Sequence, residues 1–454
     1  MPLPSGPSSS VEAQTFAWFS RPHAFLAECQ AQFGDCFTLR VQGWGTQVVV
    51  SHPDAIRQVF TAEPDVLHAG NNDFLRPLFR EGSLLVLDGE RHRRTRKLLM
   101  PAFHGSALKR YSRAIADTTK ALMRAWPLDQ PMPMQEKLLE LSLEVAMLAI
   151  FGLREAEARY HPVKKQLTTL MKAVSTSITL ASAERSAAAA RFDSIRSQLD
   201  ALLAEELAHR RAHPDATRTD VLALLMEARD EAGQPMSEGE LRDELITLLL
   251  AGHDTTANEL AWALLALDAN PEARDRLVED VDKLGPSPDP DALVRRPLLG
   301  ATVNEVLRLH PVVPAVSRKV MKPFRVAGHV LEPGTGVAPA IFLAHRRAES
   351  FPEPEAFRPE RFMERDPSPF EYLPFGGGTR RCIGMGFALH QMKLVLGTVL
   401  GELELHSAMR HPVREVRHGV LVGPSEGARM IARRRPEHAR RNTMDKELEC
   451  GTRS

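Results

Sequence analysis

The stretch Phe375-Gly-Gly-Gly-Thr-Arg-Arg-Cys-Ile-Gly384 decides how the rest of this chain is interpreted. Pro374 prevents a helix before it, its glycines free the backbone, and the apolar run 387–396 predicts a helix after it. Cys382 is therefore predicted close to a helix N-terminus, where backbone N–H groups and the helix dipole favour a thiolate and Arg380 adds a cation. A thiolate in this setting is a metal ligand, whereas an isolated cysteine after a glycine turn is more often buried and inert.

The spacing of five residues in this stretch resembles the haem-ligand loop of the cytochrome P450 superfamily; they are Phe375, Gly378, Arg380, Cys382 and Gly384. The resemblance implies that Cys382 is the axial ligand of haem b iron, and that its thiolate promotes cleavage of the O–O bond of O2, the co-substrate. It also implies that Phe375, Gly376 and Gly384 contact the haem. The implied fold is mainly α (α+β), a single domain with a helix-rich region and a smaller β-rich region. The haem is expected between a long central helix and the cysteine loop.

Composition sets limits on the class of protein. Of 454 residues, 43% are hydrophobic, enough for a sizeable core, and the 58 Lys and Arg equal the 58 Asp and Glu, so nothing indicates a nucleic-acid partner. The four cysteines include no CxxC pair, which is typical of a reducing compartment; the roles of Cys29, Cys36 and Cys450 stay open. Without an apolar run of membrane-spanning length or a signal-like N-terminus, we expect no membrane anchor and a cytoplasmic location, as in the soluble bacterial branch of the family.

The expected organisation is a single folded unit with two polar ends. Residues 1–20 are predicted to be an extended Pro-rich lead, 21–435 a single haem-thiolate monooxygenase domain, and 436–454 a flexible polar tail. The runs 36–41 and 46–50 predict a hairpin around Gly43-Trp-Gly45. From about residue 90 to 310 the pattern is helical, and short strands and loops are expected from 311 to 380.

A long helix is predicted from Ser237 to about Ala269, with a capping box at its start and Asn270-Pro271 at its end. Its middle, Gly252 together with residues 254–256, consists of poor helix formers. A polar notch on a solvated face is the simplest explanation, but the apolar residues on both sides leave little room for such a face. Breaks of local rules inside an element are often functional.

The segment Ala251-Gly-His-Asp-Thr-Thr256 resembles the oxygen-activation motif of the same superfamily. The resemblance implies that Ala251 and Gly252 leave space for O2. Asp254 would move protons from solvent, and Thr255 would hydrogen-bond the dioxygen or its water. His253 occupies the variable position of the motif and is assigned no role.

Glu305 and Arg308 lie three residues apart on a predicted helix that Pro311 ends, a spacing that is common and weak by itself. The resemblance to the ExxR and PERF segments of the superfamily, the latter met by Pro359-Glu-Arg-Phe362, gives it weight. It implies a buried structural triad of Glu305, Arg308 and Arg361.

The segment 89–103 predicts a basic helix, and a charge run of this kind is most often a solvated face. His92 and Arg96 lie four residues apart on one side, and the resemblance to bacterial members implies that they bind the haem propionates together with Arg318 and Arg380. The same resemblance places Arg93, Arg94 and Lys97 on the face where an acidic ferredoxin would dock.

The implied activity is a monooxygenase that hydroxylates or epoxidises an apolar small molecule, a fatty acid first and a terpenoid, steroid or polyketide second. Electrons are expected from a separate ferredoxin and an NAD(P)H-dependent reductase, and the protein is expected to be a monomer. The predicted pocket wall is apolar, although such residues are equally often ordinary core; it comprises Phe74, Leu75, Leu78, Leu84, Leu85, Val86, Leu248, Ala315 and Val316. Substrate identity does not follow from these residues.

Two further interpretations stay open. A peroxide-using haem-thiolate hydroxylase or isomerase would not need the proton relay, so the presence of Asp254 and Thr255 counts against it. A non-catalytic haem-binding sensor or carrier would need the cysteine and the propionate cations but not the notch in the long helix.

Overall fold

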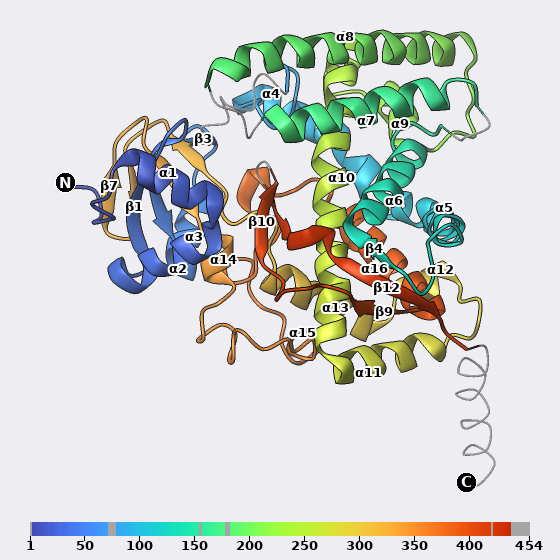
Figure 1. Ribbon diagram of the computed structural model, residues 1–454. Helices are drawn as coiled ribbons and strands as arrows, with labels where there is room; N and C mark the ends of the chain where they lie inside the picture. Colours follow the sequence, from blue (N-terminus) through green and yellow to red (C-terminus); the bar gives the residue numbers. More distant parts are fainter. Residues whose placement is uncertain (1, 71–78, 154–156, 178–181, 419–420, 437–454) are drawn as a thin grey trace.

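Helices surround one central helix, α10 (Glu238–Ala269), in the computed structural model, which describes residues 2–70, 79–153, 157–177, 182–418 and 421–436 (Figure 1). The helices before it are α1 (Val11–Ser20), α2 (Pro22–Phe33), α3 (Pro53–Phe60), α4 (Gly89–Leu99), α5 (Ser106–Met123), α6 (Met134–Ala149), α7 (Tyr160–Ser177), α8 (Ser182–Ala212) and α9 (Val221–Glu227). Those after it are α11 (Pro271–Asp282), α12 (Pro290–Val294), α13 (Pro297–Leu309), α14 (Ile341–Ala344), α15 (Arg361–Glu364) and α16 (Met385–Glu402).

The capping box at the start of α10 forms as predicted. The Ser237 hydroxyl accepts from the Glu240 amide at 3.2 Å, and the Glu240 carboxylate accepts from the Ser237 amide at 2.7 Å. Asn270 is the C-cap, and Pro271 begins α11. At 1.5 Å per residue the 32 residues of α10 span about 48 Å. The helix crosses the molecule from α8 to α11 and contributes to two apolar cores, one around each half (Figure 1).

Strands gather mainly at the N-terminal side, where residues 36–69 meet residues 318–339 (Figure 1). The largest sheet has the order β1-β2-β8-β5-β3, with β2 parallel to β8 and the other neighbours antiparallel. The strands are β1 (Cys36–Val41), β2 (Gly45–Val50), β3 (Leu67–Ala69), β4 (Pro131–Pro133), β5 (Arg318–Val320), β6 (Phe324–Val326), β7 (His329–Leu331), β8 (Gly336–Pro339), β9 (Leu403–Ser407), β10 (Glu415–His418), β11 (Leu421–Pro424) and β12 (Arg429–Arg434). The predicted hairpin is thus confirmed as β1–β2, and the mainly α fold with a smaller β region is confirmed as a whole.

The prediction for residues 1–20 was wrong in its second half, because residues 11–20 form α1. The Ser10 side chain caps this helix by accepting from the Ala13 amide, and the helix begins after the last proline of the lead. Only the part before Ser10 is extended. It lies along β1, where Pro4 and Ser5 carbonyls accept hydrogen bonds from Thr38. The predicted tail, apart from residue 436, lies outside the described residues, as does Cys450.

Within the described ranges, no helix is both long and apolar enough to span a bilayer. Cys29, Cys36 and Cys382 are free thiols. Burial raises the pKa of Cys29 and of Cys36 to about 11, so both stay protonated at neutral pH and are poor candidates for metal ligands.

Candidate active site

The loop 375–384 is a tight turn that delivers Cys382 to the start of α16. The Cys382 amide donates to the Phe375 carbonyl at 2.9 Å, which closes the loop. Gly378 has a φ of 68°, and a Cβ there would lie 2.6 Å from the backbone oxygen of Phe60. Glycine is required at this position for both reasons. Phe375, Gly376 and Gly384 are half-buried around the cysteine, with Gly384 as the N-cap of α16.

Cys382 itself is exposed although it stands in the interior of the fold. The amides of Gly384 and Met385 and the charge of Arg96 lower its pKa, as expected for a helix N-terminus, but burial acts more strongly and the net shift is upward. The helix N-terminus therefore favours the thiolate, as expected from the sequence, but burial outweighs this effect. A cation bound at the sulfur would change that balance.

Four basic side chains cluster beside the cysteine loop. His92 and Arg318 are buried, and Arg96 and Arg380 are half-buried. Burial, together with the charges of Arg380, Arg96 and Arg318, lowers the pKa of His92 to about 4, so the four groups lie close to one another and His92 is neutral. Burial and Arg380 also lower the pKa of Arg318, to about 10. This excess of positive charge in a buried place suits a group that carries carboxylates.

Asp88, which the sequence interpretation missed, is the carboxylate of this cluster. It precedes α4 and would ordinarily cap that helix, but it makes no capping bond. Its Oδ1 instead accepts from the Ala69 amide at 2.7 Å and from Arg380, which also donates to the Leu87 carbonyl. The position of Asp88 before a basic helix can be detected in the sequence. Its pairing with Arg380 cannot, because the two residues are distant in the chain.

The middle of α10 has the predicted notch. Ala251 and Gly252 are exposed in a helix that is otherwise buried on most sides, and a Cβ at Gly252 would meet no atom within 4 Å. The Thr255 hydroxyl donates to the Ala251 carbonyl at 2.8 Å, which leaves its oxygen free to accept a further hydrogen bond. Space and a hydroxyl thus occur together on one face of the helix.

Asp254 is an acid in enclosed surroundings. Although 42% of its side-chain surface is accessible, the surrounding protein removes enough solvent to raise its pKa to about 6. His253 Nε2 lies 3.5 Å from Asp254 Oδ1, but burial lowers the pKa of His253 to about 3, so the imidazole is neutral and does not form an ion pair with the carboxylate. A carboxyl with a pKa of about 6 can both bind and release a proton near neutral pH.

Glu305, Arg308 and Arg361 meet in the interior between α13 and α15. Arg308 Nε and Nη2 donate to the two carboxylate oxygens of Glu305 at 2.7 and 2.9 Å, and Arg361 Nε donates to Oε1 at 3.0 Å. The Arg358 amide donates to Oε1 as well, at 2.8 Å. All three side chains are buried, so one carboxylate is hydrogen-bonded to two guanidinium groups away from water.

Of the three side chains expected on a docking face, Arg94 is otherwise engaged. It donates to Asp230 at 2.6 Å, to Glu240 at 3.1 Å and to the Pro235 carbonyl, and so ties α4 to the start of α10. Arg93 and Lys97 are exposed, each paired with an exposed carboxylate. Arg94 was misassigned because its acidic partners are more than 130 residues away in sequence.

The predicted pocket wall is partly assembled. Leu84, Val86 and Leu248 pack in one apolar core, with Leu85 against it, and Val316 lies near Gly376. Ala315 packs instead in the core beneath α2 and β1. Phe74, Leu75 and Leu78 lie outside the described residues.

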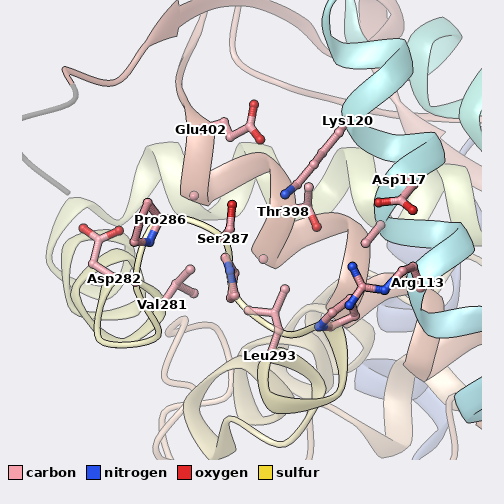
Figure 2. A pocket seen from close by; sticks show the side chains of 16 residues that line it. Arg113, Asp117, Lys120, Val281, Asp282, Pro286, Ser287, Leu293, Thr398 and Glu402 are labelled. Carbon is pink, nitrogen blue, oxygen red and sulfur yellow. The ribbon is translucent and has the colours of Figure 1, made fainter. Parts of the chain in front are cut away.

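A separate pocket of about 130 Å³ lies between α5, the link from α11 to α12, and α16 (Figure 2). Figure 2 shows Lys120, Ser287 and Thr398 directed toward it. None of the candidate site residues named above lines it, so it is distinct from the candidate site.

Two buried glutamates of α10 were also missed. Glu244 and Glu259 are nearly inaccessible, and burial raises the pKa of Glu244 to about 8 and that of Glu259 well above its ordinary value. Glu259 accepts from the Val312 amide at 3.3 Å. An acidic residue inside an apolar helical run is a signal that sequence reasoning can detect.

Known proteins are similar to this chain over nearly its whole length. The family model described as Cytochrome P450 matches residues 4–430. The chain is 40% identical over 439 residues to "Putative cytochrome P450 135B1" of Mycobacterium tuberculosis (strain ATCC 25618 / H37Rv), covering 95% of this chain and 92% of the relative, and 33% identical over 437 residues to "Putative cytochrome P450 137" of the same organism, covering 95% and 90%.

Solved structures extend the comparison. Retinoic acid-bound cyanobacterial CYP120A1 superposes with a TM-score of 0.84 at 26% identity, covering 96% of this chain and all of that one. The cytochrome P450DA heme domain superposes with a TM-score of 0.86 at 24% identity, covering 96% and 98%, which shows the fold alone. Together with the match of the family model over nearly the whole length, these likenesses show that the chain belongs to the cytochrome P450 family, whose members are monooxygenases that bind haem b and use O2 as co-substrate.

Proposed function

We propose that this chain is a haem-thiolate monooxygenase that inserts one oxygen atom into an apolar small molecule, with Cys382 as the axial ligand of the iron. The observation that carries this proposal is the conjunction of an exposed cysteine in the loop 375–384 with the exposed Ala251 and Gly252 of α10. Both are accessible inside the fold, as two surfaces that face a flat cofactor would be.

The residues present fit haem. Thiolate is a known axial ligand of haem iron, and His92, Arg96, Arg318 and Arg380 supply cations and donors for two propionates. Arg380 also donates to Asp88 and to the Leu87 carbonyl, which fixes its guanidinium group beside the loop. When bound, the haem supplies the activation of O2 with two electrons and the transfer of one oxygen atom to the substrate.

The proton path that we propose uses two residues of α10. Asp254, partly accessible and with a pKa of about 6, takes protons from solvent. The Thr255 hydroxyl, fixed by its bond to the Ala251 carbonyl, accepts a hydrogen bond from the incoming donor and orients it toward the open face beside Gly252. An intact path of this kind is what separates a monooxygenase from a haem carrier.

The two electrons come, in this proposal, from a separate ferredoxin and an NAD(P)H-dependent reductase. Support comes from Arg381, an exposed cation that adjoins Cys382, and from the exposed Arg93 and Lys97 of α4, whose charges Glu90 and Glu231 offset in part. Such a surface attracts an acidic partner through long-range electrostatics.

A fatty acid is our first candidate for the substrate, because the described part of the wall, Leu84, Leu85, Val86 and Leu248, is aliphatic. A terpenoid is the second candidate, and the specific observation in its favour is that the CYP120A1 structure, similar in fold and 26% identical, holds retinoic acid. Both candidates are elongated apolar molecules.

The test is an optical titration of the ferric haem-loaded protein with one compound from each substrate class: dodecanoic acid for fatty acids, retinoic acid for terpenoids, and a steroid. A low-spin to high-spin shift with one class, followed by formation of its hydroxylated product from O2 and NAD(P)H with a surrogate ferredoxin, supports the proposal. Cys382→Ser is the matched variant and is expected to lose the thiolate spectrum. A Cys382→Ser protein with an unchanged thiolate spectrum would refute the ligand assignment.

A further inference from the structure

The segment Phe79–Leu87 is clamped to the first half of α10. Asp243 Oδ2 accepts from the Gly82 amide at 3.2 Å, and a Cβ on Gly82 would approach that oxygen to 2.6 Å. One turn further along α10, Thr247 Oγ1 lies 2.7 Å from Ser83 Oγ. These contacts fix Gly82 and Ser83, which immediately precede the residues of the predicted pocket wall. We call Phe79–Leu87 as a whole the clamp segment.

Helix α8 holds the clamp segment from the other side. Arg196, fully buried, donates to Asp243 Oδ1 at 2.9 Å, so one carboxylate of α10 is shared between α8 and the segment. Arg80 of the segment pairs with Asp200 of α8 at 2.9 Å. The clamp segment therefore lies where three parts of the chain, distant in sequence, meet.

Glu244 lies in the middle of this junction and has no accessible surface. Neither carboxylate oxygen makes a hydrogen bond of normal geometry to any described residue, although the Leu84 amide is close enough to lower its pKa. Burial dominates, with a smaller contribution from the charges of Asp243 and Glu240, and raises the pKa to about 8. The side chain is thus an uncharged acid at neutral pH, since an isolated buried carboxylate is costly.

The position of Glu244 on α10 connects it to the reaction site. Glu244 precedes Ala251 by seven residues and Thr255 by eleven, which at about 100° per residue places each of them within roughly 20° of Glu244 around the helix, on opposite sides of it. The distance along the axis from Glu244 to Ala251 is about 10 Å. Leu84 and Val86, next to the clamp contacts, share an apolar core with Leu248 on the same face.

We propose that Glu244 is a positioning residue whose uncharged side chain fills the junction between the clamp segment and α10, and that its ionisation releases the wall formed by Leu84 to Val86. The proposal rests on the proposed function only in identifying that wall as the substrate's. The charges that act on Glu244 are those of Asp243 and Glu240 on α10. These two carboxylates in turn pair with Arg196 of α8 and Arg94 of α4, and Arg80 of the segment pairs with Asp200 of α8. Asp243 and Glu240 already have arginine partners, so neither Arg196 nor Arg94 is free to neutralise an ionised Glu244.

The direction of the pH effect follows from proton linkage. With the segment closed the pKa is about 8, and with it open, in water, it returns toward the ordinary 4.5. At a pH between these two pKa values, opening of the clamp segment therefore releases a proton from Glu244. The closed form is favoured most below pH 4.5 and loses stability as the pH rises toward 8, by at most about tenfold per pH unit. Above that range the effect is constant.

The experiment measures hydrogen exchange of the peptide 79–87 in the haem-loaded protein between about pH 6 and about pH 8, corrected for the intrinsic rate. We expect opening of the wild-type segment to increase by up to about tenfold per pH unit. Glu244→Gln keeps the shape and cannot ionise, so its segment should stay closed at both pH values. In Glu244→Ala, which leaves the junction unfilled, the clamp segment should be open at both pH values. Glu238 is a half-buried glutamate at the start of the same helix; Glu238→Gln is the matched control and should behave as wild type.

A functional readout uses dodecan-1-ol, an uncharged aliphatic probe, in the same spectral titration. Its affinity should fall with rising pH in the wild type and stay constant in Glu244→Gln. A wild-type segment whose opening is independent of pH, or a Glu244→Gln protein with the wild-type pH dependence, would overturn the proposal. Failure of dodecan-1-ol to shift the spectrum while the segment opens as expected would count against the aliphatic substrate class and not against the role of Glu244.

Discussion

Replacing Glu305 by glutamine tests the interior charge cluster directly. The Glu305 carboxylate has no accessible surface and accepts four N–H bonds: two from Arg308 at 2.7 and 2.9 Å, one from Arg361 at 3.0 Å and one from the Arg358 amide at 2.8 Å. Glutamine keeps the shape of the side chain but removes its charge. It also directs an NH2 group at arginine donors, where only an acceptor can bond.

The size of the stability loss follows from the two arginines that remain in the interior. Arg308 keeps its bonds to the His345 and Pro354 carbonyls, and Arg361 keeps that to the Pro352 carbonyl, so both guanidinium groups stay fixed in the interior. Removing one partner of a buried ionic cluster costs about 3 to 5 kcal/mol, because the remaining charges are stranded without solvent. That corresponds to a decrease of roughly 160- to 5,000-fold in the folding equilibrium constant.

The assay is urea unfolding of the haem-loaded protein, followed by haem absorbance and by tryptophan fluorescence in parallel. Glu360→Gln is the matched control: Glu360 pairs with the exposed Arg276 at 2.7 Å, and such surface pairs contribute about 0 to 1 kcal/mol. A Glu305→Gln protein that loses less than about 1 kcal/mol of stability would contradict the view that this cluster carries uncompensated charge when one member is removed.

Three variants test the site itself. Thr255→Ala should divert reducing equivalents to hydrogen peroxide, measured as peroxide and product formed per NAD(P)H; an unchanged product yield would contradict the proton role. Because burial raises the pKa of Asp254 to about 6, turnover should show an inflection near that pH that Asp254→Asn abolishes. The folded protein resists ionisation of this group, so Asp254→Asn should be more stable than wild type above about pH 6 and equal to it below pH 3.8, measured by thermal unfolding at each pH. Gly378→Ala should lower haem content per protein, since its Cβ would meet the Phe60 oxygen at 2.6 Å, whereas Gly285→Ala, with a similar positive φ and open space, should retain haem.

The fold was largely predictable from the chain because its strongest signals are local. A capping box, an apolar run and an Asn-Pro stop define α10 to within a residue, and the glycines around Trp44 define the β1–β2 hairpin. The error in the N-terminal lead also has a local origin. The extended conformation was predicted to continue past Ser10, although the prolines end before this serine and Ser10 caps a helix.

The chain by itself determined which residues are candidates for the proposed chemistry: Cys382 after its glycine loop, the Asp254-Thr255 pair in a helix that would otherwise be apolar, and the basic residues of α4. Tertiary structure alone decided their electrostatic state. The pKa of Cys382 is raised and not lowered, Arg94 is an anchor to α10, and Glu244 is an uncharged acid beneath the clamp segment. The physical reason is that desolvation and ion pairing depend on the groups that surround a side chain, and here those groups come from segments more than a hundred residues apart.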